Sequence, residues 1–320
     1  AGVPGTVAGL LMAQEKYGSM PLKDVICPAL KLAKKGFPIT HDLARVMGSM
    51  EKRLKKWPES AAVYYKPDGS RYEAGETWKQ PDLARTLKKI IKKGKDGFYK
   101  GEIAKLIAED MRKNGGLITE DDLDNYIPQL TDVIWGEYLG YQIASMPPPS
   151  SGGVHVIQML NILEDFPIKE YGHNAAATIH VMAEAMRLAY ADRSKHLGDP
   201  LYWDVPTEEL TSEDYADFLV DKINENRATP SSEVAPGNPT DYESEETTHF
   251  SVIDKYGNVV SNTYTLNFSF GNGAVVKGTG ILLNNEMDDF SAKPGTPNAF
   301  GMLGDEANAI QPGKRPLSSM

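Results

Sequence analysis

Residues 228–246, with the sequence ATPSSEVAPGNPTDYESEE, separate two parts of the chain that differ in character. This segment holds three prolines, several serines and glutamates, and almost no apolar side chains. Structureless loops longer than about 12–15 residues are uncommon inside compact domains, where they are usually functional or disordered. We therefore predict a flexible acidic linker, with a separate structural block on each side of it.

The part before the linker is predicted to be mostly helical, because its apolar residues recur at the i, i+3, i+4 spacing of one helix face. Gly36 and the Gly115-Gly116 pair end two of these patterns. Between the helices, a strand pair is expected at 131–146 with its turn near Gly136, and a small hairpin at 64–72. The expected helices span 6–16, 22–35, 41–56, 82–93, 101–113, 153–164, 174–197 and 212–226.

The part after the linker has the pattern of β-strands. Residues 247–254 and 259–266 alternate in polarity, and the segment Lys255-Tyr256-Gly257-Asn258 between them has the turn chemistry of a β-hairpin. More strand is expected at 273–283, and a polar loop rich in glycine and proline follows to residue 316. The sequence therefore predicts a helix-rich block, a linker and a strand-rich block.

Charge and hydropathy limit the partners of the chain. Its 320 residues include 34 Lys and Arg against 44 Asp and Glu, which gives a net charge of −10. Nucleic acids and anionic membranes are bound mostly by clustered Lys and Arg, so we predict neither as a partner. The lysines between 88 and 95 lie on one predicted helix and are interpreted as its solvated face. No stretch approaches 18 consecutive apolar residues, so no membrane span is predicted, and no signal peptide is visible.

Several classes of catalytic centre are excluded by the motifs. The patterns G-x-S-x-G and H-E-x-x-H, the P-loop and the EF-hand loop are absent. Cys27 is the single cysteine, which excludes an intrachain disulfide and a zinc site made of several cysteines. The six histidines are scattered, and His155, His173 and His180 are interpreted as structural or surface residues. We therefore expect no metal site.

Thr247 and Thr248 stand where the linker meets the first strand. A threonine hydroxyl becomes a useful nucleophile when a base lies beside it, and its own α-amine supplies one once the preceding peptide bond is cut. A free α-amine has a pKa of about 7.7–8.0, so part of it is neutral near physiological pH. A cut after Glu246 or Thr247 would create such a residue. β-branched residues also begin strands often, and on spacing alone that second interpretation is the more common one.

Two polar clusters follow in the strand-rich block. Residues 284–289, NNEMDD, place two amides and three carboxylates in six positions after an apolar strand. They suit a calcium ion or an ammonium group, although the alternate spacing and the glycine of a calcium loop are missing. Ser318 and Ser319 offer hydroxyl and backbone donors for a carboxylate. Because the chain starts on Ala1 without Met and ends on PLSSM without a turn, we also expect an internal fragment.

These residues lie in longer motifs, through which the chain resembles the γ-glutamyltranspeptidases of the N-terminal-nucleophile hydrolase superfamily. The resemblance runs essentially from end to end and favours the catalytic interpretation of Thr247. The matching motifs are VPGTVAGL (3–10), NGGLIT (114–119), MPPPSSGG (146–153), AYADRS (189–194), TTHFSVIDKYGN (247–258), TYTLN (263–267), GILLNNEMDDFSAKPG (280–295) and KRPLSSM (314–320).

The resemblance implies an α+β fold, the αββα four-layer sandwich of the superfamily, with Thr247 at the end of a central strand. It implies autocatalytic cleavage of a precursor between Glu246 and Thr247. The large-subunit part is then residues 1–246, including the linker, and the small-subunit part is residues 247–320. A periplasmic or secreted location is implied as well.

The resemblance also implies roles for individual residues. Thr247 is the expected nucleophile, and Thr265 is the threonine that hydrogen-bonds it and assists processing. Phe300, in a lid over the pocket at 294–305, stands where some members have tyrosine. The family's carboxylate-binding arginine and its oxyanion Gly-Gly pair match no residue of this chain. The donor's α-ammonium is expected to bind Asn267, Glu286 and Asp289, and its α-carboxylate Ser318 and Ser319.

The implied activity is that of a γ-glutamyl transferase and hydrolase. Thr247 would form an acyl-enzyme from glutathione or a similar donor, with water, an amino acid or a peptide as the acceptor. No metal or organic cofactor is implied. A glutaryl or cephalosporin-type acylase of the same superfamily is one alternative, and a non-catalytic fragment that binds γ-glutamyl compounds is another. Glu286 and Asp289 favour a donor with an amine, because an amine-free substrate would desolvate two carboxylates without giving them a partner.

Overall fold

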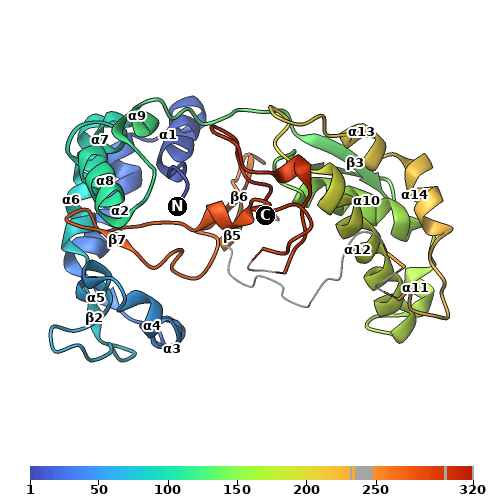
Figure 1. Cartoon of the computed structure of the whole chain (residues 1–320), viewed down its shortest axis with the longest axis horizontal. Helices are drawn as coiled ribbons and strands as arrows, with labels where there is room; N and C mark the ends of the chain where they lie inside the picture. The colour runs from blue at the N-terminus through green and yellow to red at the C-terminus, as the bar shows by residue number, and fades with distance from the viewer. Residues whose placement is uncertain (231–232, 235–247, 299–300, 319–320) are drawn as a thin grey trace. The chain divides into compact units, whose positions relative to one another are not determined.

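The computed structural model describes residues 1–230, 233–234, 248–298 and 301–318. Runs of helices are interrupted by short strands along this part of the chain, so the fold mixes α and β structure (Figure 1). Contacts divide it into two compact units: the first is Ala1–Leu130 with Glu246–Glu286, and the second is Thr131–Glu245 with Met287–Met320. Most of the predicted linker at 228–246 lies outside the described residues.

The first unit contains helices and pairs of short antiparallel strands, in which β1 pairs with β2, β5 with β6 and β7 with β8. Its helices are α1 Thr6–Tyr17, α2 Leu22–Lys35, α3 His41–Ser49, α4 Glu51–Leu54, α5 Pro58–Tyr64, α6 Pro81–Lys93, α7 Asp96–Tyr99, α8 Gly101–Asn114 and α9 Glu120–Asp124. Its strands are β1 Phe37–Pro38, β2 Thr77–Trp78, β5 Thr248–Ile253, β6 Val259–Tyr264, β7 Val275–Val276 and β8 Ile281–Leu282.

Strand β7 joins two apolar cores of the first unit. Successive side chains of a strand point to opposite faces. Val276 accordingly packs in the core that contains Ile107 of α8, while Val275 packs in the core that contains Leu54 of α4. The buried hydroxyl of Ser60, in α5, accepts a hydrogen bond from the Val275 N–H at 2.8 Å. The segment that carries β7 and β8, although it follows the predicted linker, is therefore part of the helical core of this unit.

The second unit is centred on α10, which packs against α12, α14 and the β3–β4 hairpin. Its buried side chains form two apolar clusters, one around Val154 and Leu317 and the other around Ile162 and Leu219. Its elements are β3 Ile134–Tyr138, β4 Tyr141–Ser145, α10 Gly152–Glu164, α11 Ile168–Tyr171, α12 Ala176–His196, α13 Thr207–Leu210, α14 Glu213–Val220 and the 3₁₀ helix η2 Glu306–Asn308. A further 3₁₀ helix, η1 Glu286–Asp289, begins on the last residue of the first unit.

Two of the predicted helices are shorter in the structure. The helix expected at 41–56 is interrupted at Met50, where the hydroxyl of Ser49 donates to the Val46 carbonyl at 2.8 Å. A serine that bonds to nearby backbone competes with helix continuation. The helix expected at 212–226 ends at Val220 as α14.

The hairpins at 64–72 and 131–146 also differ from their predictions. Residues 66–70 form a turn, closed by the Lys66 N–H on the Ser70 carbonyl at 3.0 Å, but no strands flank it. The pair β3–β4 does form, but its turn lies at Leu139 and Gly140, whose φ angles are +49° and +81°. Gly136, expected at the turn, lies within β3.

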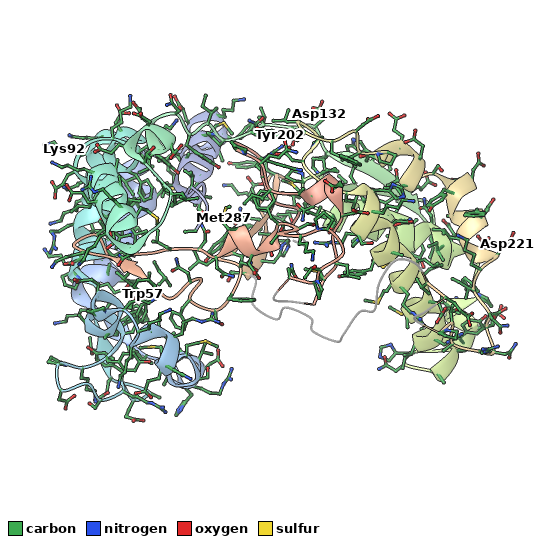
Figure 2. All side chains as sticks on the ribbon, in the orientation of Figure 1. Trp57, Lys92, Asp132, Tyr202, Asp221 and Met287 are labelled. Atoms are coloured by element: carbon green, nitrogen blue, oxygen red, sulfur yellow. The ribbon has the colours of Figure 1, made fainter. Side chains whose placement is uncertain are left out.

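The predicted solvated face of the lysine-rich helix is confirmed for Lys88, Lys92 and Lys93, whereas Lys89 and Lys95 are half-buried and Lys95 lies beyond the end of the helix. Helix α6 buries Ala84 and Ile90, and Lys92 is exposed on it (Figure 2). Across the described residues, no helix combines the length and the apolar character that a membrane crossing requires.

Candidate active site

The predicted site residues fall into three groups in the structure. Those outside the described residues are Glu246, Thr247, Phe300 and Ser319, so their roles stay predictions. Those in the first unit are Thr265, Asn267 and Glu286. Those in the second unit are Asp289 and Ser318.

The β5–β6 hairpin places Thr265 in the first unit. Its strands pair in register from Ile253↔Val259 to Thr248↔Tyr264, so Thr265 follows directly at the end of the hairpin where β5 begins. The turn at the other end is held by Asp254, whose carboxylate accepts hydrogen bonds from the Asn258 side chain at 2.8 Å and backbone N–H at 2.9 Å. These bonds lower the pKa of Asp254. The predicted hairpin is confirmed.

A group of polar side chains on this hairpin was not predicted from the sequence. The imidazole of His249 lies 2.7 Å from the Thr263 hydroxyl through Nδ1, and 3.2 and 3.3 Å from the hydroxyls of Ser251 and Ser261 through Nε2. These residues lie on one face of the two strands because alternate positions share a face. His249, Ser251 and Ser261 are exposed to solvent, and Thr263 is half-buried.

Thr265 and Asn267 are brought together in a tight turn after β6. The Thr265 hydroxyl accepts a hydrogen bond from the Asn267 N–H at 3.0 Å. Asn267 is buried and has a left-handed φ of +75°, a conformation that asparagine tolerates better than most residues. Its side-chain amide donates to the Asn285 carbonyl at 3.3 Å, and the Phe268 N–H donates to the Asn285 side chain at 2.9 Å.

Glu286 follows Asn285 directly, so the same contacts bring it near Asn267 in the first unit. Its backbone N–H donates to the Asn284 side chain at 3.1 Å. The Asn284 amide also bonds both the N–H of Gly2, at 2.8 Å, and its carbonyl, at 3.0 Å. The two asparagines of the NNEMDD motif therefore position the backbone around Glu286. The motif could be recognised in the sequence, but the residues that its two asparagines bond could not be predicted from it.

Ser318 is held on both sides of its peptide unit in the second unit. Its N–H donates to the Pro149 carbonyl at 2.9 Å. Its own carbonyl accepts two hydrogen bonds from Ser151, one from the N–H at 2.8 Å and one from the hydroxyl at 2.9 Å. Ser151 is fully buried at the N-cap position of α10, yet its hydroxyl makes no capping bond. The PPPSSGG motif thus serves to fix the segment that carries Ser318.

Arg193, on α12, connects this arrangement to Asp289. The guanidinium is buried, and its Nε donates to the Ser151 hydroxyl at 3.2 Å. Burial lowers the pKa of Arg193, while Tyr190 and the negative charge of Asp289 act in the opposite direction. An arginine keeps its charge in proteins. Asp289 therefore lies in the field of a buried cation, which the sequence prediction of an ammonium-binding carboxylate did not include.

The residues before Ser318 are anchored to the end of α12. Asp199 is fully buried and accepts from Arg315 three times, from Nη2 at 2.7 Å, Nε at 3.1 Å and the backbone N–H at 2.9 Å. Burial alone would raise the pKa of Asp199, but the hydrogen bonds from Arg315 outweigh it and lower the pKa. Lys314 is also buried, with its ammonium on the Ala307 carbonyl at 2.9 Å. The KRPLS segment is therefore rigidly placed.

His155, in α10, lies close to Tyr190 and Arg193 of α12. Its ring packs against Tyr190 at 4.8 Å between centroids, and its Nε2 is buried without a hydrogen-bond partner among the residues that the structure describes. Burial, together with the charge of Arg193, lowers the pKa of His155 to about 3. The ring is therefore neutral near pH 7 and suits the structural role that we expected from the sequence.

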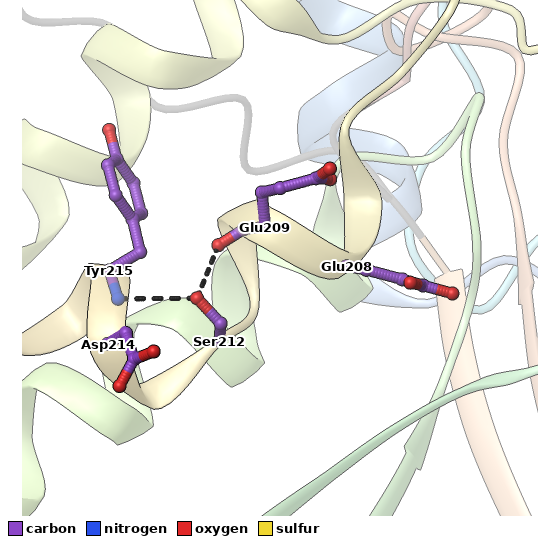
Figure 3. Close-up of a pocket in the computed structure, with 5 residues that line it drawn as sticks. All are labelled: Glu208, Glu209, Ser212, Asp214 and Tyr215. Atoms are coloured by element: carbon purple, nitrogen blue, oxygen red, sulfur yellow. Dashed lines mark hydrogen bonds between the residues drawn. The ribbon is translucent and has the colours of Figure 1, made fainter.

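A hollow elsewhere in the second unit contains none of the predicted site residues. It lies at the corner between α13 and α14 and has a volume of about 470 Å³ (Figure 3). Ser212 shapes this corner by accepting from the Tyr215 N–H at 3.2 Å and donating to the Glu209 carbonyl at 2.9 Å. Within the part of the chain that the structure describes, no three His, Cys, Asp or Glu side chains form a metal-binding group. The hollow is lined by Glu208, Glu209, Ser212, Asp214 and Tyr215.

Comparison with known proteins gives matches over the whole chain. The family model described as gamma-glutamyltranspeptidase matches residues 1–320. The glutathione hydrolase proenzyme of Escherichia coli (strain K12) is 52% identical over 323 residues, which cover 100% of this chain and 55% of that protein. This chain therefore spans about half the length of that relative.

Two solved structures are similar to the chain in fold. The γ-glutamyltranspeptidase of Helicobacter pylori superposes with a TM-score of 0.72 at 43% identity, over 74% of this chain and 68% of that one. The cephalosporin acylase of Bacillus halodurans superposes with a TM-score of 0.84 at 31% identity, over 99% of this chain and 56% of that one. Both similarities agree with the mixed helix and strand content of the structure.

Proposed function

This chain belongs to the γ-glutamyltranspeptidase family, and from that premise we propose that the full-length protein hydrolyses γ-glutamyl amides and transfers γ-glutamyl groups. Glutathione is the proposed donor, and water, an amino acid or a peptide is the acceptor. The observation that carries the proposal is the 52% identity to a glutathione hydrolase proenzyme, which extends over all of this chain.

The proposed chemistry uses Thr247 as the nucleophile, freed by cleavage after Glu246. Its hydroxyl oxygen attacks the γ-carbonyl carbon while the hydroxyl proton passes to the α-amine of the same residue. The amide C–N bond then breaks, the leaving amine takes that proton, and a γ-glutamyl ester remains on Thr247. Water or an acceptor amine attacks the ester, gives up a proton and restores the threonine hydroxyl. Thr265 supports the nucleophile by a hydrogen bond in this proposal.

Recognition of the donor head group is proposed to be divided by charge. Asn267, Glu286 and Asp289 accept hydrogen bonds from the α-ammonium, and Ser318 and Ser319 donate to the α-carboxylate. The N–H of Ser318 already donates to the Pro149 carbonyl, so the hydroxyl of Ser318 is the donor that we propose for the carboxylate, and the bonded peptide fixes its position. Charge-assisted hydrogen bonds of this kind are about twice as strong as neutral ones.

The remaining expectations from the resemblance are part of the same proposal. They are an αββα four-layer sandwich in the full-length protein, a large part ending at Glu246 and a small part starting at Thr247, a lid that includes Phe300, and a periplasmic or secreted location. The similarity in fold to two relatives, at TM-scores of 0.72 and 0.84, supports the first of these.

An acylase activity on glutaryl substrates is the second candidate. The similarity to the cephalosporin acylase of Bacillus halodurans, at 31% identity, favours it. The carboxylates of Glu286 and Asp289 favour the γ-glutamyl donor instead, because the acylase substrate has no amine to compensate them. Arg193 offsets part of the charge of Asp289, so the charge of this carboxylate does not by itself exclude an amine-free substrate. Comparing turnover of γ-glutamyl and glutaryl substrates therefore decides between the two activities.

The proposed function is tested on the full-length protein by intact mass and turnover. We expect two chains separated before Thr247, and release of p-nitroaniline from γ-glutamyl p-nitroanilide at a higher kcat/KM than from glutaryl p-nitroanilide. Thr247→Ala should give one uncut chain without turnover. Thr248→Ala is the matched control and should mature and turn over. If Thr248→Ala is inactive and Thr247→Ala is not, the cut lies after Thr247 and the assignment is wrong.

A further inference from the structure

The side chain of Asn308 bonds two backbone segments that carry residues of opposite proposed roles. Its Nδ2 donates to the Asp289 carbonyl at 2.7 Å, and its Oδ1 accepts from the Leu317 N–H at 2.9 Å. Asp289 is proposed to bind the donor's ammonium, and Leu317 precedes Ser318, which is proposed to bind its carboxylate. One amide therefore links the two ends of the head-group site within the second unit.

Asn308 is itself held in place. Its side chain is almost completely buried, with 3% exposure, at the end of η2. Its N–H donates to the Asp305 carbonyl and its carbonyl accepts from the Ser291 N–H, both at 3.0 Å. Because main chain and side chain are both bonded, the amide cannot turn away from either partner without breaking hydrogen bonds in a buried place.

The packing around η2 is also close. A Cβ atom placed on Gly198, two residues after α12, would lie 2.2 Å from the Ala307 carbonyl oxygen, so the two backbones touch there. The same carbonyl accepts the ammonium of the buried Lys314 at 2.9 Å. Residues 305–308 are thus a fixed support, and Asn308 projects from it between the two segments.

An amide is the side chain that this position requires. It supplies one donor for the Asp289 carbonyl and one acceptor for the Leu317 N–H, which a carboxylate or an apolar group cannot do. The ammonium and carboxylate of an α-amino acid sit on the same carbon, so a site that binds both must keep its two halves at one separation. Recognition at two points is lost when the spacing shifts by about an ångström.

We propose that Asn308 is a positioning residue that fixes the separation between Asp289 and Ser318, and thereby selects donors that carry both an amine and a carboxylate on the α-carbon. This inference rests on the proposed function, because it takes the head-group roles of Asp289 and Ser318 from it. Asn308 touches the site through the backbone of its neighbours and takes no part in bond making.

The test measures binding by calorimetry with three ligands on the full-length protein. L-Glutamate has both head-group charges, glutarate lacks the amine, and 4-aminobutyrate lacks the α-carboxylate. Asn308→Ala should raise the Kd of L-glutamate about three- to tenfold, the equivalent of one ordinary hydrogen bond or slightly more. The Kd values of glutarate and 4-aminobutyrate should change less than about twofold, because each ligand uses one half of the site.

Asn161→Ala is the matched control. The Asn161 amide also bridges two segments of the second unit, from α10 to the Thr211 carbonyl at 2.9 Å, but it bonds neither Asp289 nor the segment of Ser318. It should leave all three Kd values unchanged. If Asn308→Ala does not fold, Asn308→Ser, which is uncharged and cannot bond both partners as the amide does, is used with the same criterion.

Three results would overturn the inference: an unchanged Kd for L-glutamate, equal weakening of the three ligands, or opposite shifts for glutarate and 4-aminobutyrate. Equal weakening would indicate a general loss of structure, and opposite shifts would indicate an effect of charge.

Failure of the proposed function would give a different experimental result. In that case the wild-type protein binds L-glutamate without releasing p-nitroaniline from the γ-glutamyl anilide, and the three Kd values still decide the role of Asn308. Absence of L-glutamate binding in the wild type would overturn both.

Discussion

Ser151 donates two hydrogen bonds to one atom, the carbonyl oxygen of Ser318, from its N–H at 2.8 Å and from its hydroxyl at 2.9 Å. The two residues are 167 positions apart in the sequence. The parallel bridge between Ser150 and Ser318 belongs to the same contact. The start of α10 therefore sets the position of the segment to which we assign binding of the α-carboxylate.

Ser151→Ala should weaken donor binding more than turnover. The variant loses one of the two hydrogen bonds to Ser318 and the acceptor of Arg193 Nε, both in a buried place. We expect the KM for γ-glutamyl p-nitroanilide to rise about three- to tenfold with little change in kcat, and the free energy of unfolding to fall by about 1–3 kcal/mol. Steady-state kinetics and urea unfolding of the full-length protein measure both.

Ser194→Ala provides the comparison for this prediction. Ser194 is also a buried serine of the second unit, but its hydroxyl donates to Ala191 within α12 at 2.8 Å. The KM of the Ser194→Ala variant for γ-glutamyl p-nitroanilide should be unchanged. A stability loss in Ser151→Ala without a change in KM would limit Ser151 to a structural role.

Stability should depend on pH through His155. Its pKa is about 3 in the folded protein and 6.5 in the unfolded chain, mainly because burial disfavours the charged ring. The unfolded state therefore binds the proton first as the pH falls. The stabilising contribution of His155 is fully present above pH 6.5 and is lost progressively between pH 6.5 and about 3, by about 1.4 kcal/mol per pH unit.

Urea unfolding at several values between pH 7.5 and pH 4 tests this prediction. In His155→Leu the slope of unfolding free energy against pH should fall by the equivalent of one proton. His155→Gln, which is polar but does not titrate in this range, should give the same slope as His155→Leu. A wild-type slope in either variant would show that another group is responsible.

The β5–β6 hairpin could be predicted from the sequence because its signals are local. Alternating side chains and the turn residues Asp254 to Asn258 all lie within one short segment, and the turn is closed by bonds of Asp254 to its own neighbours. The predicted strands at 247–254 and 259–266 correspond to β5 and β6.

The turn between β3 and β4 could not be placed in the same way. Gly136 is needed in the strand, because a Cβ there would lie 2.7 Å from a side-chain carbon of Ile157 on α10. Leu139 takes the turn with φ of +49°, a conformation that leucine adopts rarely, and its N–H donates to the Glu164 side chain at 3.0 Å. Both causes are tertiary contacts with α10 that the local sequence does not contain.

The same distinction between local signals and distant contacts applies to the site residues. Asp289 and Ser318 are predicted site residues because the motifs that contain them resemble those of a known family. Asn308 and Arg193 were not assigned a role, because their partners lie on other segments of the second unit. Sequence patterns reveal groups that gather within a few residues. They do not reveal a side chain whose function is to join distant backbone segments.

Asp289→Asn should discriminate between donors with and without an amine. Loss of the negative charge removes charge-assisted hydrogen bonds to the ammonium, each worth about 1.5–3 kcal/mol, so kcat/KM for γ-glutamyl p-nitroanilide should fall at least about tenfold. Glutaryl p-nitroanilide should be affected much less. Stability should also fall, because Arg193 loses a nearby counter-charge. Equal losses for both anilides would remove the ammonium-binding role and favour the acylase activity.

Two substitutions of Asn267 can separate the effect of its backbone conformation from the effect of its side-chain contacts. Its φ of +75° is unfavourable for residues with a Cβ by about 1–2 kcal/mol, and glycine is free of this cost. Both Asn267→Ala and Asn267→Gly lose the side-chain bond to the Asn285 carbonyl. We expect Asn267→Ala to be less stable than Asn267→Gly by about 1 kcal/mol, since the greater freedom of glycine in the unfolded chain offsets part of the difference.

The donor KM separates the two roles of this residue. If the Asn267 amide contacts the ammonium as proposed, both variants lose the same contact and should show the same rise in KM for γ-glutamyl p-nitroanilide. Urea unfolding and steady-state kinetics on the same preparations give the two quantities. A raised KM in Asn267→Ala alone would mean that Asn267 acts only by shaping the turn after β6, because glycine preserves that turn without supplying an amide.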